Sequence, residues 1–255
     1  MERRTSFLSI EEGLSELADI DADEDTTCLP QEQFCKNDGR EGMPKPYGRG
    51  CLHFGLAIFV LPFGFYHFYV EANGNPYALV AGFFYLATNL FCYGISGLYH
   101  TQNWPPQTEI LLQKFDHCGI ALLSCGTMIP VSVLLMNYPY GLLLASSVVT
   151  TCAYTCYQIM MGNPSVARQA MVPACLVPFT YVLYFQMTSL EFTCMIMTML
   201  FQVCGMLVFV HEKPNLCHDK YCGFHELFHV FVVCAGICVY ICNWSVIHRL
   251  CNPSI

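Results

Sequence analysis

Long apolar runs separated by short polar breaks fill the chain from about residue 50 to its end. A helix needs about 20 predominantly apolar residues to cross the hydrocarbon core of a bilayer. Seven runs approach or exceed this length, at roughly 50–71, 77–100, 111–136, 139–161, 169–188, 192–211 and 223–248. The pattern predicts an all-α integral membrane protein, with a seven-transmembrane helix bundle in residues 47–255.

The breaks between these runs carry residues that favour turns. Asn73-Gly74-Asn75-Pro76 and Gly162-Asn163-Pro164 are two of them, and such clusters end helices because Pro lacks an N–H and Gly tolerates positive φ. The break at 187–191 has the weakest turn signal, so the fifth and sixth spans are the least securely separated.

The segment before the first run, residues 1–46, has a different composition. It is polar and acidic, and the first 41 positions hold 12 of the chain's 19 Asp and Glu residues. Such a segment cannot bury enough apolar surface to fold alone, so we expect a disordered tail. No apolar stretch follows Met1, and a secretory signal peptide is therefore not expected.

The positions of the basic residues predict the direction of the spans. With seven spans, ten of the 11 Lys and Arg residues fall on one side, in the tail and in the second, fourth and sixth loops. Only Arg249 falls on the other side. Because cytosolic loops carry the excess of Lys and Arg, this predicts a cytosolic N-terminus and a C-terminus outside.

Composition supports a membrane protein and excludes some partners. Hydrophobic residues make up 55% of the chain and charged residues only 12%, against about 25% charged in soluble domains. No basic stripe is present, so a nucleic-acid partner is not expected. The 17 cysteines are odd in number and lie mostly in apolar runs, where reduced Cys packs as a small hydrophobe. Nothing in the pattern distinguishes the plasma membrane from a Golgi or endoplasmic reticulum membrane.

Five polar residues lie within or at the ends of these apolar runs: Ser96, His100, Asp116, His225 and His229. Polar groups at membrane depth are costly and often mark function. Ser96 and His100 are four residues apart, as are the other two histidines, so each pair shares a helix face. The predicted directions place all five at the cytosolic ends of spans two, three and seven, where we expect them to meet.

Three imidazoles and a carboxylate are suited to a zinc site. His100, His225 and His229 would supply three neutral nitrogens and leave a fourth position for water. Zinc lowers the pKa of a bound water to about 7 and polarises a carbonyl group. Asp116 would accept a proton from that water. Ser96 would hydrogen-bond the water, a group next to the ligands, or a developing oxyanion.

Other interpretations of the same residues remain open. A buried His or Ser in a membrane often makes only an interhelical hydrogen bond. If Asp116 bound zinc directly, four protein ligands would make the site closed and structural.

Residues 225–229 also match the metalloprotease motif H-E-x-x-H, in which Glu226 would be the general base. A helix turns about 100° per residue, so Glu226 projects away from the histidines, and we expect it to bond a group beside them or to face the cytosolic interface. A second metal site at Cys217, His218 and Cys222 is a weaker alternative, because the spacing is not C-x2-C.

The remaining histidines carry less weight. His53, His67, His211 and His248 lie near the ends of spans, where we interpret them as interfacial rings, and His117 is interpreted as a packing or neighbouring group. In span three, Gly126 and Pro130 predict close helix packing and a kink.

The combination of motifs resembles the hemolysin III and progestin and adipoQ receptor family. The matching segments are Ser96-Gly-Leu-Tyr-His100, Phe115-Asp116-His117 with Gly126-Thr-Met-Ile-Pro130, and Gly223-Phe-His225-Glu-Leu-Phe-His229. The resemblance covers the chain from about residue 46. It implies a seven-helix bundle with zinc held by His100, His225 and His229 and reached by Asp116 through water.

The resemblance implies several functions. Members look like receptors for adiponectin-type proteins or progestins, like bacterial hemolysins, or like lipid hydrolases related to alkaline ceramidases. Our leading hypothesis is zinc-dependent hydrolysis of a lipid amide such as ceramide. The alternatives are a receptor for a lipophilic or protein hormone with a structural zinc, and a hemolysin-like lytic protein. The expected partners are the bilayer and a membrane lipid, and self-association into a homo-oligomer stays open.

Overall fold

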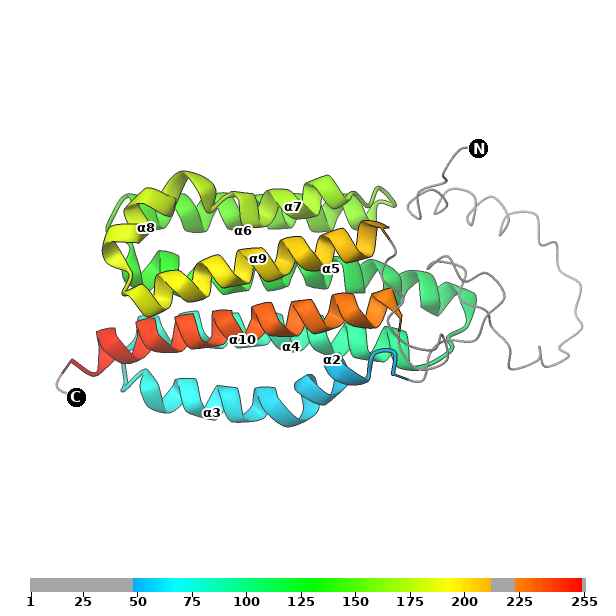
Figure 1. Cartoon of the computed structure of the whole chain (residues 1–255), viewed down its shortest axis with the longest axis horizontal. Helices are drawn as coiled ribbons and strands as arrows, with labels where there is room; N and C mark the ends of the chain where they lie inside the picture. The colour runs from blue at the N-terminus through cyan, green and yellow to red at the C-terminus, as the bar shows by residue number, and fades with distance from the viewer. Residues whose placement is uncertain (1–47, 212–222, 254–255) are drawn as a thin grey trace, which may run out of the picture.

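A computed structural model describes residues 48–211 and 223–253, and these residues form a bundle of helices (Figure 1). The predicted acidic tail and the Cys217–Cys222 alternative lie outside the described residues. The first half of the bundle contains α2 (Cys51–Gly55), η1 (Leu56–Val60), α3 (Leu61–Glu71), α4 (Pro76–Thr101), α5 (Pro106–Pro130) and η2 (Val131–Leu135). The second half contains α6 (Tyr140–Met160), α7 (Val166–Ala174), η3 (Val177–Phe179), α8 (Thr180–Gln186), α9 (Ser189–His211) and α10 (Phe224–Cys251).

Among the described residues, six helical segments are long and apolar enough to cross a membrane. They are Pro76–Thr101, Pro106–Leu135, Tyr140–Met160, Val166–Gln186, Ser189–His211 and Phe224–Cys251. The predicted first span consists of two helical pieces, Cys51–Ile58 and Leu61–Glu71, with a bend of 42° between them. The all-helical prediction is confirmed, and a seventh span is present if this bent pair counts as one.

Proline shapes two of the predicted spans. Pro62 stands in the first turn of α3, next to the bend, where its missing N–H interrupts the helix ladder. The predicted span 169–188 is divided into α7, η3 and α8. Pro173 and Pro178 lie where it divides, and their missing N–H groups interrupt the helix there. In α5, Pro130 marks the point where the α-helix gives way to the π-helical segment η2.

The weakly predicted break at 187–191 is real, and a capping box forms it. The Thr188 N–H donates to Glu191 Oε2 at 2.8 Å, and the Glu191 N–H donates to Thr188 Oγ1 at 3.3 Å. This reciprocal pair satisfies backbone donors at the start of α9. Glu191 is fully buried and also pairs with Arg249 Nη2 at 3.0 Å. The one cation predicted on the far side therefore has an acidic partner in a neighbouring helix.

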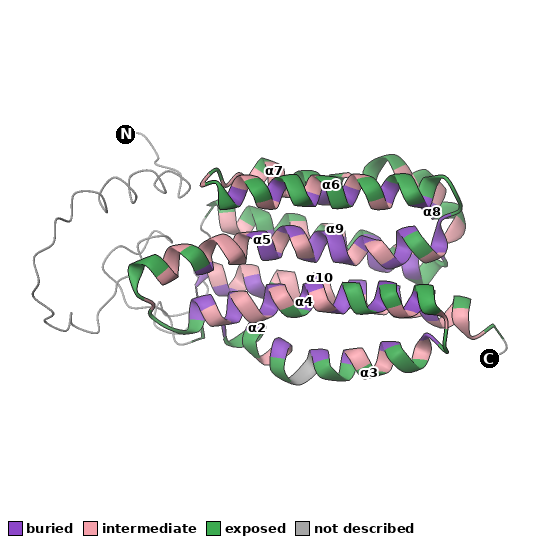
Figure 2. Cartoon of the chain, turned by 180° about the vertical axis from the view of Figure 1, so that it is seen from behind, coloured by how far each residue is buried: buried purple, intermediate pink, exposed green. Residues whose placement is uncertain are grey.

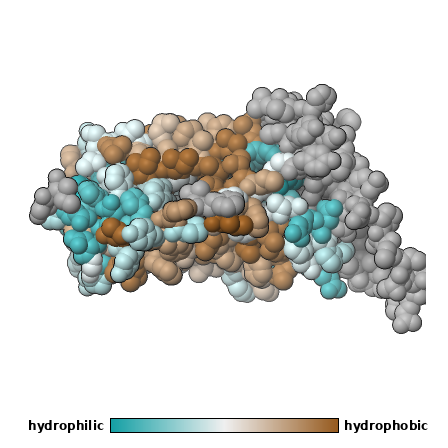
Figure 3. Space-filling model, turned by 90° about the horizontal axis from the view of Figure 1, so that it is seen from below, coloured by the Kyte–Doolittle hydropathy of each residue, from teal (hydrophilic) through white to brown (hydrophobic). Residues whose placement is uncertain are grey.

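Small residues let α4 and α5 approach closely. A Cβ added at Gly126 would collide with the Thr88 side chain, and one at Gly119 would press on the backbone of Cys92. The predicted close packing at Gly126 is confirmed. Apolar side chains dominate the middle of the surface in the space-filling view, with polar residues toward the two ends (Figure 3), as a membrane protein requires.

Helix α10 lies between two apolar cores. Cys242 and Val246 pack into the core shared with α5, α6 and α9, whereas Val239 and Ile247 pack into the core shared with α3 and α4. The buried stripe of α4 runs along its length, whereas the buried residues of α5 gather in its second half (Figure 2). Because α10 packs against both cores, its rotation is fixed, and so is the direction in which its histidines point.

Candidate metal centre

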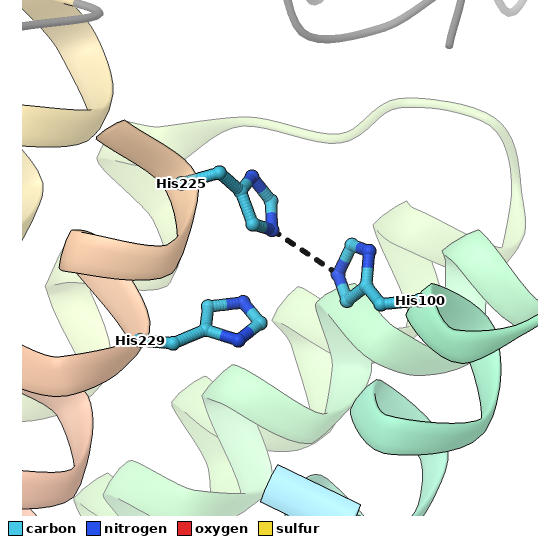
Figure 4. A group of neighbouring side chains, drawn as sticks. All are labelled: His100, His225 and His229. Carbon is cyan, nitrogen blue, oxygen red and sulfur yellow. Dashed lines mark hydrogen bonds between the residues drawn. The ribbon is translucent and has the colours of Figure 1, made fainter. Parts of the chain in front are cut away.

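Three imidazoles meet at the end of the bundle where α4 ends and α10 begins. His100 is in the last turn of α4, and His225 and His229 occupy the first two turns of α10. The three rings point toward one another from these two helices (Figure 4). One nitrogen from each ring lies within 4.8 Å of the other two, and His100 Nε2 is 3.3 Å from His225 Nε2.

The distance between His100 Nε2 and His225 Nε2 fits a tetrahedral metal ion. Zn–N bonds of about 2.0–2.1 Å at tetrahedral angles place two ligand nitrogens about 3.3 Å apart. Two imidazole nitrogens that face each other at this distance need a shared proton or a cation, because two lone pairs repel. His100 and His229 are buried, with 7% and 3% of their surface exposed, and His225 is partly buried.

Asp116 stands beside this histidine group. Its carboxylate Oδ2 is 3.6 Å from His100 Nε2, and its side chain is 15% exposed. Among the described residues, the group whose possible ligand atoms all lie within 4.8 Å of one another consists of the three histidines alone. Asp116 is therefore close to the three histidines without being part of their group.

Ser96 is buried and makes a contact that the sequence did not predict. Its hydroxyl lies 3.0 Å from His53 Nδ1 on α2, and it also lies beside the Asp116 carboxylate. Of the three roles considered for Ser96, this geometry matches a bond to a group next to the ligands.

His53 belongs to the site, and its interpretation as an interfacial ring was wrong. It is only 3% exposed, and its ring stacks on His229 with centroids 4.1 Å apart and planes within 4°. Its Nε2 is buried and has no hydrogen-bond partner among the described residues. The sequence did carry a signal for His53: the predicted start of the first span lies at the same end as the other five residues, so the predicted topology already placed His53 at their depth.

Glu226 is used as a helix cap. Its Oε2 accepts a hydrogen bond from the Gly223 N–H at 2.6 Å, and its Oε1 is 4.0 Å from Arg49 Nε in a buried ion pair. An anion at a helix N-terminus is also favoured by the helix dipole. The carboxylate is thus held by groups other than the histidines, as expected from its direction on the helix. The contacts of Glu226 do not support the metalloprotease interpretation.

Of the other histidines, His117 directly follows Asp116 on α5, whereas the remaining three lie apart from the centre. His117 Nδ1 is 3.2 Å from Gln169 Nε2, and His211 is exposed at the end of α9. At the opposite end of the bundle, His67 contacts the Tyr240 hydroxyl at 2.6 Å and His248 contacts Glu71 at 2.6 Å. The positions of His67, His211 and His248 agree with rings near the ends of spans.

Comparison with known proteins identifies the family of the chain. A family model described as haemolysin-III related matches residues 42–240. A search of curated proteins found no match. The matched range contains His53 and every predicted site residue.

Proposed function

Since this multi-pass membrane protein belongs to the haemolysin-III-related family, we propose that it is a zinc-dependent hydrolase of a lipid amide such as ceramide. The observation that carries the proposal is the meeting of three imidazoles and one carboxylate at one end of the apolar helices. Three neutral nitrogens with an adjacent carboxylate form the donor set of a catalytic zinc site.

His100, His225 and His229 would hold the metal. When bound, zinc would make a water molecule more acidic and polarise the amide carbonyl. The remaining chemistry belongs to the protein. Asp116 accepts a proton as the water oxygen adds to the acyl carbon, and the proton is returned to the amine nitrogen when the C–N bond breaks. The products are a fatty acid and a free amine.

Ser96 and His53 would fix this geometry. The His53 Nδ1 contact at 3.0 Å holds the Ser96 hydroxyl next to Asp116. The stacked His53 ring also limits rotation of His229. Groups of this kind orient ligands and commonly change metal affinity by about 10–100-fold when removed.

The location suits a lipid whose reactive bond is near its head group. The centre lies at one end of the apolar helices, so an acyl chain would extend toward the middle of the bilayer while the head group stays near water. From the distribution of Lys and Arg, we propose that this end faces the cytosol.

The second candidate is a receptor for a lipophilic or protein hormone, in which zinc is structural. The 3.6 Å approach of Asp116 to His100 Nε2 favours it, because a carboxylate this close could move into the fourth position and close the site. Ligand binding would then act through the packing of α4 and α10.

Fatty-acid release from ceramide by purified protein in lipid nanodiscs tests the proposal. We expect release by the zinc-loaded protein, loss of release after chelation, and recovery when zinc is added back. Glu109→Ala is a matched control, because it removes a carboxylate from α5 two turns before Asp116. Stoichiometric zinc with no product would contradict the hydrolase and favour the receptor.

The role of His53 gives a second expected result. His53→Ala removes both the stacked ring and the contact with Ser96, so zinc affinity should fall by about 10–100-fold. His53→Phe keeps an aromatic ring on His229, so its zinc affinity should fall less than that of His53→Ala. Competition with a fluorescent zinc chelator measures both. His67→Ala, at the opposite end of the bundle, should bind zinc normally, and wild-type affinity in His53→Ala would show that His53 does not position the ligands.

A further inference from the structure

Four cysteines lie together where α5 packs against α6. Cys118 and Cys125 come from α5, and Cys152 and Cys156 come from α6. The Cys152 thiol is within hydrogen-bonding reach of the Cys125 and Cys156 thiols, and the Cys156 thiol is also within reach of Cys118. The compact group of possible metal ligands among the described residues contains none of them. Reaction between a pair of thiols is therefore the chemistry that this arrangement favours.

The side chains of Cys118 and Cys156 cross between the two helices. Cys118 Sγ lies 3.8 Å from the Cys156 carbonyl oxygen, and Cys156 Sγ lies 3.9 Å from the Cys118 carbonyl oxygen. One turn nearer the end of the bundle, Lys114 Nζ donates to the Met160 carbonyl oxygen at 3.1 Å. Steps of four residues along α5 thus match steps of four back along α6, so the two cysteines stand opposite each other in antiparallel helices. A disulfide between helices requires opposed positions of this kind.

The two thiols differ in their exposure. Cys118 is 5% exposed, whereas Cys156 is partly exposed and precedes Tyr157, which is 59% exposed. A reagent that approaches α6 from outside the bundle therefore meets Cys156 first, and Cys118 is shielded behind it. An accessible thiol with a second thiol beside it is the usual arrangement of redox-sensing cysteines.

From these features we propose that Cys156 and Cys118 form a reversible oxidation site for a hydroperoxide. The Cys156 sulfur attacks the terminal peroxide oxygen, and the O–O bond breaks to leave a sulfenic acid on Cys156 and an alcohol, or water if the oxidant is hydrogen peroxide. The Cys118 sulfur then attacks the Cys156 sulfur, so that a disulfide forms and water leaves. The hydroperoxide is reduced, and the two thiols are oxidised.

The position of the pair suits a reversible bond. It lies one turn inside the end of the bundle that we assign to the cytosol, where disulfides are usually transient and redox-sensing. Reduced glutathione there would attack the disulfide and restore both thiols. This site does not depend on the proposed zinc chemistry.

Mass spectrometry of the full chain in lipid nanodiscs tests the proposal. The reduced protein is treated with hydrogen peroxide, or is placed in discs that contain a phospholipid hydroperoxide, and its free thiols are then alkylated. Chymotrypsin separates the cysteines of the cluster, because aromatic residues, Leu and Met lie between them. We expect a linked peptide that joins Cys118 to Cys156, and its loss after reduced glutathione is added. Faster linkage by the phospholipid hydroperoxide would identify the bilayer as the source of the oxidant, and faster linkage by hydrogen peroxide would identify the water phase.

Variants test the order of the two steps. Cys118→Ser should leave Cys156 as a sulfenic acid that dimedone traps, whereas Cys156→Ser should leave Cys118 reduced. Cys204→Ser is the matched control, because it removes an exposed thiol from α9 and should form the link normally. Gel filtration and a thermal melt confirm that each variant is folded. Oxidation of Cys204 while Cys118 and Cys156 both stay free, or linkage of Cys156 to Cys152 instead, would overturn the proposal.

Discussion

His229→Ala is expected to lose both zinc and fatty-acid release. His229 is one of the three proposed nitrogen donors, is buried, and lies between the ring of His53 and the other two histidines. Loss of a direct ligand should lower zinc affinity by more than the roughly 100-fold that a neighbouring group can cost. The melting temperature should fall as well, because zinc binding stabilises the folded state that binds it. Metal analysis after gel filtration and a thermal melt measure the two effects.

The matched control is His248→Ala, which removes a histidine from the other end of the same helix, where it contacts Glu71. This variant should keep stoichiometric zinc. Full zinc occupancy in His229→Ala would mean that the metal is held elsewhere, and the proposed donor set would be wrong.

Asp116→Ala is expected to separate metal binding from turnover. Asp116 lies beside the three histidines but is not one of the proposed ligands, so zinc should stay bound. Fatty-acid release should fall by about 10²–10⁴-fold, the range for loss of a general base. Single-turnover assays on zinc-saturated protein measure the chemical step.

The outcome for the metal is as informative as the rate. Loss of zinc in Asp116→Ala would show that the carboxylate is a direct ligand and that the site is closed. The Glu109→Ala control on the same helix should retain both zinc and turnover, which excludes a general effect of removing charge from α5.

Most of the centre was predictable because helix periodicity and span direction act together. The four-residue spacing places His225 and His229 on one face of α10, and opposite directions bring the end of α4 to the starts of α5 and α10. His53 was missed because apolar composition does not define how α2 is rotated. Packing sets that rotation: a Cβ at Gly97 would meet the Phe54 backbone, so α2 lies directly against α4 beside Ser96.

Helix ends were more predictable than helix continuity. The break before α9 has a local cause in the capping box of Thr188 and Glu191, a pattern visible in the sequence. The interruptions near Pro62 and Pro173 also have a signal in the sequence, since proline interrupts a helix. Spans defined by mean hydropathy do not show them, because a single proline hardly changes the mean of a long apolar run. The size of the bend in the first span, 42°, depends on packing against the other helices and could not be read from the run itself.

The separation of the three histidines along the chain also sets an order of events during synthesis. His100 comes from α4, whereas His225 and His229 come from the last helix, 125 or more residues later. A nascent chain that has inserted only its earlier helices holds one third of the donor set. If the proposed donor set is right, metal capture would wait until α10 has reached its place between the two cores, and the bound ion would mark chains in which α4 and α10 have come together.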